Sequence, residues 1–294
     1  MSTRPPAAPP ARTPATRIPP TISVVIPVRD DADGLRRCLA ALARQTVRPL
    51  EIVVVDNGSS DDSAEVARAA GARVVDESEE GIPAASARGF DEARGDLVAR
   101  LDADCVPRAD WLAGIARAFE ERPHLVAVSG WAHFGDGPRL LRRSLAAVYL
   151  TAYTAFSSPG LGHPPLFGSN CAVRRDAWQA VSAEVHRHDA LVHDDLDLSV
   201  HLGALPAAAA GATGRYRRPG IRLDRRIGMA ISMRPFADPR AFALRVRRGV
   251  HTLTVHRGRR GSDRLLPRPL LSRSRTALHA DTQRGPERSG AVQA

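Results

Sequence analysis

The sequence has no lysine: all 42 basic residues are arginine, they outnumber the 32 acidic residues, and the formal net charge is +10. Arginine, alanine, glycine and proline dominate, which indicates a bias of the coding DNA rather than a surface selected to bind nucleic acid. Aromatic residues make up only 4% of the chain, so no stacking platform for single-stranded nucleic acid is visible. We therefore expect no nucleic-acid partner. Because arginine binds phosphate in a bidentate manner, the excess of arginine is compatible with a phosphate-bearing ligand or an anionic membrane surface as a partner.

Cysteine is also scarce. Cys38, Cys105 and Cys171 are too widely spaced for a disulfide framework or a zinc motif, and we expect them to be small buried residues. A reducing, cytoplasmic location fits this usage. No apolar run is long enough to span a bilayer, and residues 1–20 lack the apolar segment of a signal peptide.

Apolar β-branched runs alternate with amphipathic segments through residues 21–130. The pattern predicts strands at residues 22–27, 50–55, 72–75, 97–101 and 126–130. It predicts helices at residues 34–45, 64–70, 83–93 and 107–121. Strands and helices that alternate with short links indicate an α/β fold with a single Rossmann-like, doubly wound, mostly parallel sheet.

The remainder of the chain is less regular. Its residue pattern predicts helices at residues 139–156, 175–181 and 194–205. It also predicts a strand at residues 170–173 and a Pro/Gly-rich loop at residues 157–168. We expect one folded domain over residues 21–257. A Pro/Ala-rich tail at residues 1–20 and a basic tail at residues 258–294 are expected to be disordered.

An Asp-Ala-Asp segment, Asp102 to Asp104, follows the predicted strand at residues 97–101. Carboxylates in such pairs hold Mg²⁺ or Mn²⁺ together with substrate phosphates. A bare pair of this kind is also common in solvated turns. Its position at the carboxyl end of a buried strand, where α/β sheets bind their ligands, favours a functional site.

Two further polar clusters follow other predicted strands. Residues 56–61 read Asp-Asn-Gly-Ser-Ser-Asp, and residues 28–31 follow the first strand. Asp56 can accept a hydrogen bond from a base or a ribose hydroxyl, and the alternative is an Asx turn that caps the next helix. Neither cluster is specific by itself.

Taken together, these segments resemble family 2 glycosyltransferases, which are inverting enzymes of the A-type fold. Residues 55–61 resemble the family's Val-Asp-(Asp/Asn)-Gly-Ser-x-Asp motif, and residues 95–104 its Gly-(Asp/Glu)-apolar-Asp-x-Asp motif. Residues 168–175 and 194–199 resemble its Gly-x-Asn and Glu-Asp-x-Asp-Leu segments. The first-strand motif and the Ala-Arg-Asn-x-Gly motif are only partly kept, at residues 27–31 and 87–91. The likeness covers about residues 21–205.

The resemblance implies a metal-dependent inverting transferase that moves a sugar from a UDP-, GDP- or dTDP-sugar to a hydroxyl of a polysaccharide, lipid-linked or small-molecule acceptor. It implies a donor half at residues 21–130, an acceptor half at residues 131–257, Asp195 as the general base, and Asp102 and Asp104 as ligands of Mg²⁺ or Mn²⁺. The donor-binding residues that it implies are Pro27, Val28, Asp31, Asp56, Asn57, Arg88, Asp102, Ala103 and Asp104. The acceptor-side residues that it implies are Gly168, Asn170 and Asp194.

Other interpretations compete with this one. A nucleotidyltransferase uses a similar domain and paired carboxylates, but residues 27–34 lack the Gly-rich phosphate loop that it needs. A non-catalytic relative is the second alternative. Several histidines lie close together in the sequence, and a His-rich metal site, with His193 beside Asp194 and Asp195 as one ligand, is an alternative for them. Because their spacing matches no metal motif, we expect them on the surface instead. They are His186, His188, His193 and His201.

The helix expected at residues 139–156 carries Arg139, Arg142 and Arg143 in its first turns. Apolar residues recur further along it, at Leu140, Leu141, Leu145, Val148, Tyr149 and Phe156. Such a helix can rest on an anionic leaflet at the inner face of a membrane, close to a lipid-linked acceptor. The alternative is that it simply packs on the sheet.

Overall fold

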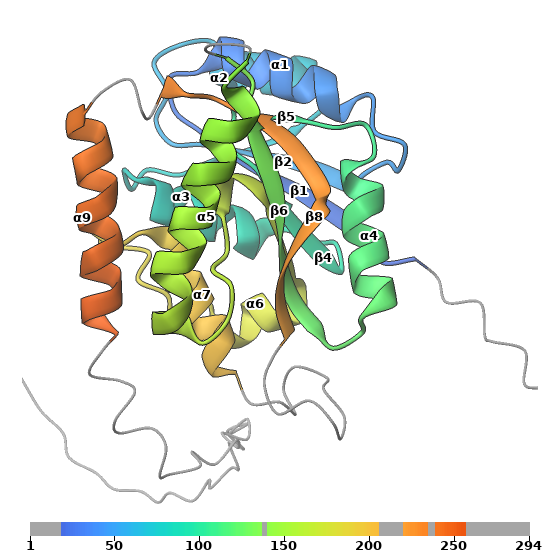
Figure 1. Cartoon of the computed structure of the whole chain (residues 1–294). Helices are drawn as coiled ribbons and strands as arrows, with labels where there is room; N and C mark the ends of the chain where they lie inside the picture. Colours follow the sequence, from blue (N-terminus) through green and yellow to red (C-terminus); the bar gives the residue numbers. More distant parts are fainter. Residues whose placement is uncertain (1–18, 137–139, 206–219, 235–238, 257–294) are drawn as a thin grey trace, which may run out of the picture. The chain divides into compact units, whose positions relative to one another are not determined.

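The computed structural model describes residues 19–136, 140–205, 220–234 and 239–256 (Figure 1). The tails expected at residues 1–20 and 258–294 lie outside these ranges, apart from residues 19 and 20. Their predicted disorder stays a prediction.

A sheet with strand order β3-β2-β1-β4-β7-β6-β8-β5 organises the described residues. Strands β3, β2, β1 and β4 are parallel neighbours, β7 runs antiparallel to β4 and β6, and β8 runs parallel to β6. The mostly parallel α/β sheet is therefore confirmed. Its strands are β1 (Ile22–Val28), β2 (Glu51–Asp56), β3 (Arg73–Asp76), β4 (Leu97–Arg100), β5 (Val106–Pro107), β6 (Leu125–Phe134), β7 (Cys171–Arg174) and β8 (Gly220–Ile231).

Helices cover both faces of this sheet. Successive residues of a strand point to opposite faces, so neighbouring residues of one strand pack against different helices. Val24 and Ile26 of β1 belong to one buried cluster, and Val25 belongs to the other. The first cluster includes residues of α1 (Ala32–Leu42), α2 (Ser63–Ala69), α4 (Trp111–Glu121) and α5 (Arg142–Leu161). The second includes residues of α3 (Ile82–Glu92), α6 (Arg175–Val181) and α7 (Asp194–Ala204).

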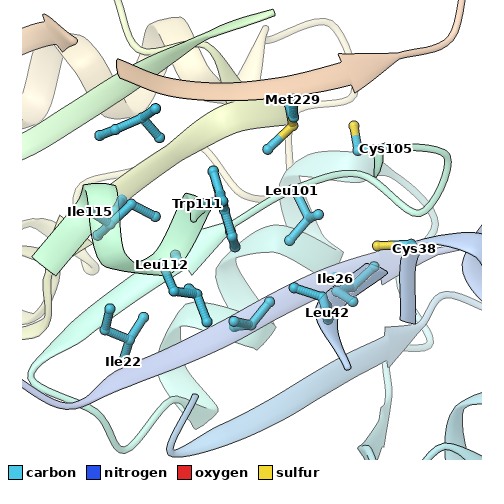
Figure 2. Packing of buried hydrophobic residues seen from close by; sticks show 14 of the residues in the cluster. Ile22, Ile26, Cys38, Leu42, Leu101, Cys105, Trp111, Leu112, Ile115 and Met229 are labelled. Atoms are coloured by element: carbon cyan, nitrogen blue, oxygen red, sulfur yellow. The ribbon is translucent and has the colours of Figure 1, made fainter. Parts of the chain in front are cut away.

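Figure 2 shows part of the first cluster, which contains Leu42 of α1 and Trp111 of α4. Cys38 and Cys105 lie in the same core, and Cys171 is buried in β7. All three are free thiols. The expectation that the cysteines serve as small buried residues is confirmed.

Helix α5 is longer than the sequence pattern indicated. It continues to Leu161, so the first part of the loop expected at residues 157–168 is helical. The helix ends at Gly162, whose φ of 79° is the left-handed conformation that glycine adopts without a steric penalty. The loop was expected from the proline and glycine content of this segment, and that expectation was wrong for its first residues, since Pro159 and Gly160 lie inside the helix. No helix among the described residues is long and apolar enough to cross a membrane.

The sequence pattern missed strand β8 and helix α9 (Pro239–Val255). Charged residues interrupt the alternation along β8, and its exposed and buried positions follow no simple period. In α9, apolar residues recur at helical spacing, at Phe242, Val246, Val250 and Leu253, but four arginines interrupt them and several of the apolar side chains are exposed. Both elements depend on partners far away in the sequence: β8 pairs with β6, and α9 contacts α7.

Candidate functional site

The carboxyl ends of β1, β2 and β4 border a cavity of about 270 Å³, which we call the strand-end cavity. The sheet register brings these ends together, because Val28 pairs with Asp56 and Val25 pairs with Arg100. Most of the residues expected to bind a donor line it, namely Pro27, Val28, Asp31, Asn57, Asp102, Ala103 and Asp104. The other lining residues are Arg29, Ile82, Ala85, Arg234 and Arg245.

Asp102 and Asp104 leave the end of β4 with their side chains close together. One carboxylate oxygen of each lies, with the Cys105 sulfur, in a group whose atoms are all within 4.8 Å of one another. Burial, followed by the charge of Asp102, raises the pKa of Asp104 above its ordinary value. Burial also keeps the pKa of the Cys105 thiol far above its ordinary value, so it offers no thiolate. The two carboxylates are the groups that suit a hard cation.

Arg234 places a positive charge at the same rim. Its guanidinium pairs with Asp31 and donates to Asp104 Oδ2 at 3.0 Å. Its side chain is 59% exposed, which leaves it free to turn toward a phosphate of a ligand. No sequence pattern distinguished Arg234, because arginine is frequent throughout the chain.

The other predicted donor residues have different surroundings. Asn57 lines the strand-end cavity, but its amide nitrogen donates to Glu77 O and Glu79 O and its oxygen accepts from Gly81 N. It therefore fixes the segment that leads into α3. Asp56 and Arg88 line neither this cavity nor the second one described below. Asp56 accepts a hydrogen bond from the backbone of the following turn, and Arg88 pairs with Glu92 on α3.

Arg100, the last residue of β4, is a buried guanidinium between two carboxylates. It donates to Asp194 Oδ2 at 2.5 Å and to Asp102 Oδ1 at 3.2 Å. Burial opposes its charge, but Asp194 and then Asp102 outweigh this and raise its pKa. A Cβ at Gly168 would lie 2.5 Å from Arg100 Nη1, so this close approach requires glycine. Arg100 was not among the predicted site residues, although a charge inside the apolar run 97–101 was a usable signal.

A second cavity, of about 70 Å³, lies between α5, the start of α7 and α9, and we call it the helix-walled cavity. Ile82, Asp102 and Arg245 line both cavities, which makes the two contiguous. The predicted residues Gly168, Asp194 and Asp195 line the helix-walled cavity. Its other lining residues are Pro83, Arg100, Tyr149, Tyr153, Phe167, Ser169, Val192, His193 and Arg248.

Asp195 is held by several donors at the wall of this cavity. Its oxygens accept from Gly168 N at 2.8 Å and Tyr153 Oη at 3.2 Å, and His193 Nδ1 lies 2.5 Å away. Burial opposes ionisation, but the charge and hydrogen bond of His193 and then the Gly168 amide keep the pKa of Asp195 below its ordinary value. Burial lowers the pKa of His193 in turn, but the Asp195 charge outweighs it and raises that pKa. The pair is therefore an oriented carboxylate and imidazole.

Two arginines of α9 make one wall of this cavity basic. Arg245 and Arg248 both line the helix-walled cavity, and the buried Nε of Arg248 has no hydrogen-bond partner among the described residues. An anionic group in the cavity would have these guanidinium groups within reach.

Asn170, expected on the acceptor side, lies outside both cavities. It is fully buried, its oxygen accepts from Trp111 Nε1 at 2.8 Å, and its nitrogen donates to Trp131 O and Ile227 O. These bonds fasten the segment before β7 to α4, β6 and β8. The side chain of Asn170 therefore forms hydrogen bonds inside the protein and does not face a cavity.

The expectation of surface histidines is correct for His188, whose side chain is 73% exposed. It is wrong for His193, which pairs with Asp195, and for His201, which is only 5% exposed. His201 lies instead in a cluster with His186, Asp197 and His256. Spacing could not reveal this cluster, because His256 is far from the others in the sequence.

Comparison with known proteins supports the resemblance of the motifs. The family model "Glycosyl transferase family 2" matches residues 23–181, which is more than half of the chain. Glycosyltransferase AglE of Haloferax volcanii is 36% identical over 101 residues, which are 32% of this chain and 33% of that protein. Undecaprenyl-phosphate 4-deoxy-4-formamido-L-arabinose transferase of Pseudomonas paraeruginosa is 43% identical over 93 residues, 28% of this chain and 27% of that protein. The match thus spans about a third or less of either relative.

Solved structures share the fold over a larger part of the chain. Glucosyl-3-phosphoglycerate synthase of Mycobacterium tuberculosis, in a complex with Mn²⁺, UDP and glucosyl-3-phosphoglycerate, superimposes with a TM-score of 0.55. The likeness covers 81% of this chain and 80% of that one at 21% sequence identity. Such a low identity establishes the fold alone.

The Arg100 contacts predict a large stability effect. Arg100→Met should lower the free energy of unfolding by about 3–5 kcal/mol, because it leaves Asp102 and Asp194 without their shared buried cation. Arg36→Met is the matched control, since Arg36 pairs with Asp33 at an exposed site and should cost at most about 1 kcal/mol. Urea unfolding measures both, and equal small losses would contradict a structural role for Arg100.

Proposed function

This chain belongs to glycosyl transferase family 2, and from this premise we propose that it transfers a sugar from a nucleotide-diphosphate sugar to an acceptor hydroxyl with inversion. The observation that supports the proposal most directly is the junction of the two cavities at Asp102. Asp104 lines the strand-end cavity and Asp195 lines the helix-walled one. A donor in the first and an acceptor in the second would therefore meet beside Asp102.

The residues of the strand-end cavity fit a divalent cation. Asp102 and Asp104 offer oxygen ligands close together, and a bound cation would offset the repulsion between their two charges. Mg²⁺ and Mn²⁺ bind through one or two carboxylates and complete their coordination with phosphate oxygens and water. When bound, such a cation would stabilise the charge that develops on the departing nucleoside diphosphate.

The protein side chains would supply the other steps. Arg234 can exchange Asp31 and Asp104 for a donor phosphate, because its side chain is largely exposed. Asp195 is ionised and held by Gly168 N, Tyr153 and His193, so it can take the proton of an acceptor hydroxyl as that oxygen attacks the anomeric carbon. Attack opposite the leaving group inverts the anomeric configuration.

The metal requirement leads to the first test of function. Asp104→Asn should abolish transfer and weaken Mn²⁺-dependent binding of UDP, because the cation loses a charged ligand. Calorimetry with UDP and Mn²⁺, and turnover with candidate nucleotide sugars, measure the two effects. Exposed Asp33→Asn is the control and should behave as wild type. Full transfer in EDTA would contradict metal dependence, and release of pyrophosphate from a nucleoside triphosphate would favour the nucleotidyltransferase alternative.

Asp195→Asn tests the general base. Turnover should fall by roughly 10²–10⁴, the usual contribution of a positioned base, whereas UDP binding should be unchanged because the donor cavity is intact. Asp195 is buried, so the melting temperature of the variant is measured alongside. NMR of the product should show inversion at the anomeric carbon, and a retained configuration would require a different mechanism.

The acceptor would be an anionic, lipid-linked molecule. Arg245 and Arg248 line the helix-walled cavity and suit an acceptor that carries phosphate. Two of the helices that wall this cavity carry exposed apolar side chains, and Figure 1 shows α9 beside α5. The exposed apolar residues of α5 and the segment before it are Leu140, Leu141, Leu145, Val148 and Phe156, and those of α9 are Phe242, Leu244, Val246, Val250 and Val255.

These exposed side chains, together with nearby arginines, predict binding to an anionic membrane. The full chain should sediment with vesicles of mixed phosphatidylcholine and phosphatidylglycerol at low salt, and binding should decline as salt rises. The double variant Val148→Ser, Phe156→Ser should bind less, whereas Leu50→Ser, at an exposed site away from these helices, should bind normally. Protein that stays in the supernatant at low salt would remove the membrane proposal.

A further inference from the structure

Three histidine side chains surround the carboxylate of Asp197, which lines neither the strand-end cavity nor the helix-walled cavity. Asp197 and His201 lie four residues apart on α7 and so share one face of the helix. His186 comes from the segment between α6 and α7, and His256 follows the end of α9. Asp197, His201 and His256 are 3%, 5% and 2% exposed, so the cluster is almost wholly removed from solvent.

The ring nitrogens are directed at a single oxygen atom, Asp197 Oδ1. His256 Nε2 lies 2.7 Å from it, His186 Nδ1 lies 2.8 Å from it, and His201 Nε2 lies 3.4 Å from it. The second oxygen, Oδ2, accepts from the backbone N–H of His186 at 2.8 Å. That bond fixes the carboxylate so that Oδ1 alone faces the three rings.

Hydrogen bonding within the cluster does not satisfy all of these groups. His186 and His256 can each donate to Asp197 Oδ1, but His201 Nε2 is buried and has no hydrogen-bond partner among the described residues. The other nitrogen of that ring, Nδ1, lies 3.6 Å from Glu184 Oε2.

We propose that His186, Asp197, His201 and His256 form a structural zinc site. Three imidazole nitrogens and one carboxylate oxygen are a donor set that zinc prefers, and four protein ligands close a tetrahedral site. Bonds of 2.0–2.1 Å place ligand atoms about 3.3 Å apart, and all four donor atoms here lie within 4.8 Å of one another. Mg²⁺ and Mn²⁺ favour oxygen ligands, so this site would differ chemically from the Asp102–Asp104 pair.

The zinc ion would fasten α9 to the rest of the catalytic unit. Near its C-terminal end, α9 makes two described polar contacts with the segment before α7, from His193 N to Thr252 Oγ1 and from His251 to Asp189. His256 adds a third attachment point, to α7 itself. Because α9 carries Arg245 and Arg248, the site would keep the basic wall of the helix-walled cavity in place. The proposal does not depend on what the enzyme transfers.

Metal analysis of the full chain, purified without a polyhistidine tag from zinc-supplemented medium, tests the site. We expect about one zinc per chain by mass spectrometry. His201→Ala and His256→Ala should lose it, whereas His188→Ala, an exposed histidine near the cluster, and Asp104→Asn should keep it. Zinc retained at one per chain in both His201→Ala and His256→Ala would overturn the assignment.

A second measurement on the wild-type protein avoids the risk that a core variant fails to fold. After removal of metal with a chelator, added Zn²⁺ should raise the melting temperature by about 10 °C at saturating excess, and Mg²⁺ should not. Co²⁺ should give the visible absorption bands of a tetrahedral site. A chain that purifies without zinc, shows no shift and gives no tetrahedral cobalt spectrum has only a hydrogen-bonded histidine cluster, and the proposal fails.

Discussion

Arg100 carries a positive charge into the interior at the end of β4, where removal from water is costly unless the charge is paired. Asp102 and Asp194 supply that pairing, so one guanidinium joins the sheet edge to the start of α7. Gly168 leaves room for the guanidinium, and its amide holds Asp195. Asp102, proposed to bind the metal, and Asp195, proposed as the base, therefore owe their relative position to Arg100, which needs to touch neither substrate.

The first turn of α7 shows how one short acidic segment serves three purposes. Successive helical residues are rotated by about 100°, so Asp195 points away from Asp194 and Asp197, which lie on adjacent parts of one face of the helix. Asp194 faces Arg100, Asp195 faces His193 and the cavity, and Asp197 faces the three histidines. Concentrating carboxylates at a helix N-terminus is also favourable, because the helix dipole is positive there.

Both cavities combine carboxylates with arginines, in a way that suits the proposed chemistry. The strand-end cavity has an acidic floor at Asp102 and Asp104, which suits a cation and the phosphates bound to it. The helix-walled cavity has a basic wall from α9, which suits an anionic acceptor. Arg245 borders both cavities, so α9 contributes to each. How firmly α9 is held in place therefore affects both the proposed donor site and the proposed acceptor site.

The sequence alone determined the α/β class and most elements of the donor half, because the apolar runs there are local and regular. It also determined where the strand-end carboxylates lie, since the carboxyl ends of neighbouring parallel strands meet at one edge of the sheet. The motif residues Asp102, Asp104 and Asp195 needed no tertiary information to be singled out.

Only the tertiary structure decided which of those residues face a cavity. It assigned Asn57 and Asn170 to backbone and indole partners, and it brought in Arg100, Arg234 and Arg245. In a chain whose basic residues are all arginine, no local pattern distinguishes an arginine that pairs inside the protein from one on its surface. The same holds for His201 and His256, because the contacts that bury them join segments far apart in the sequence, and periodicity reports only on neighbours along the chain.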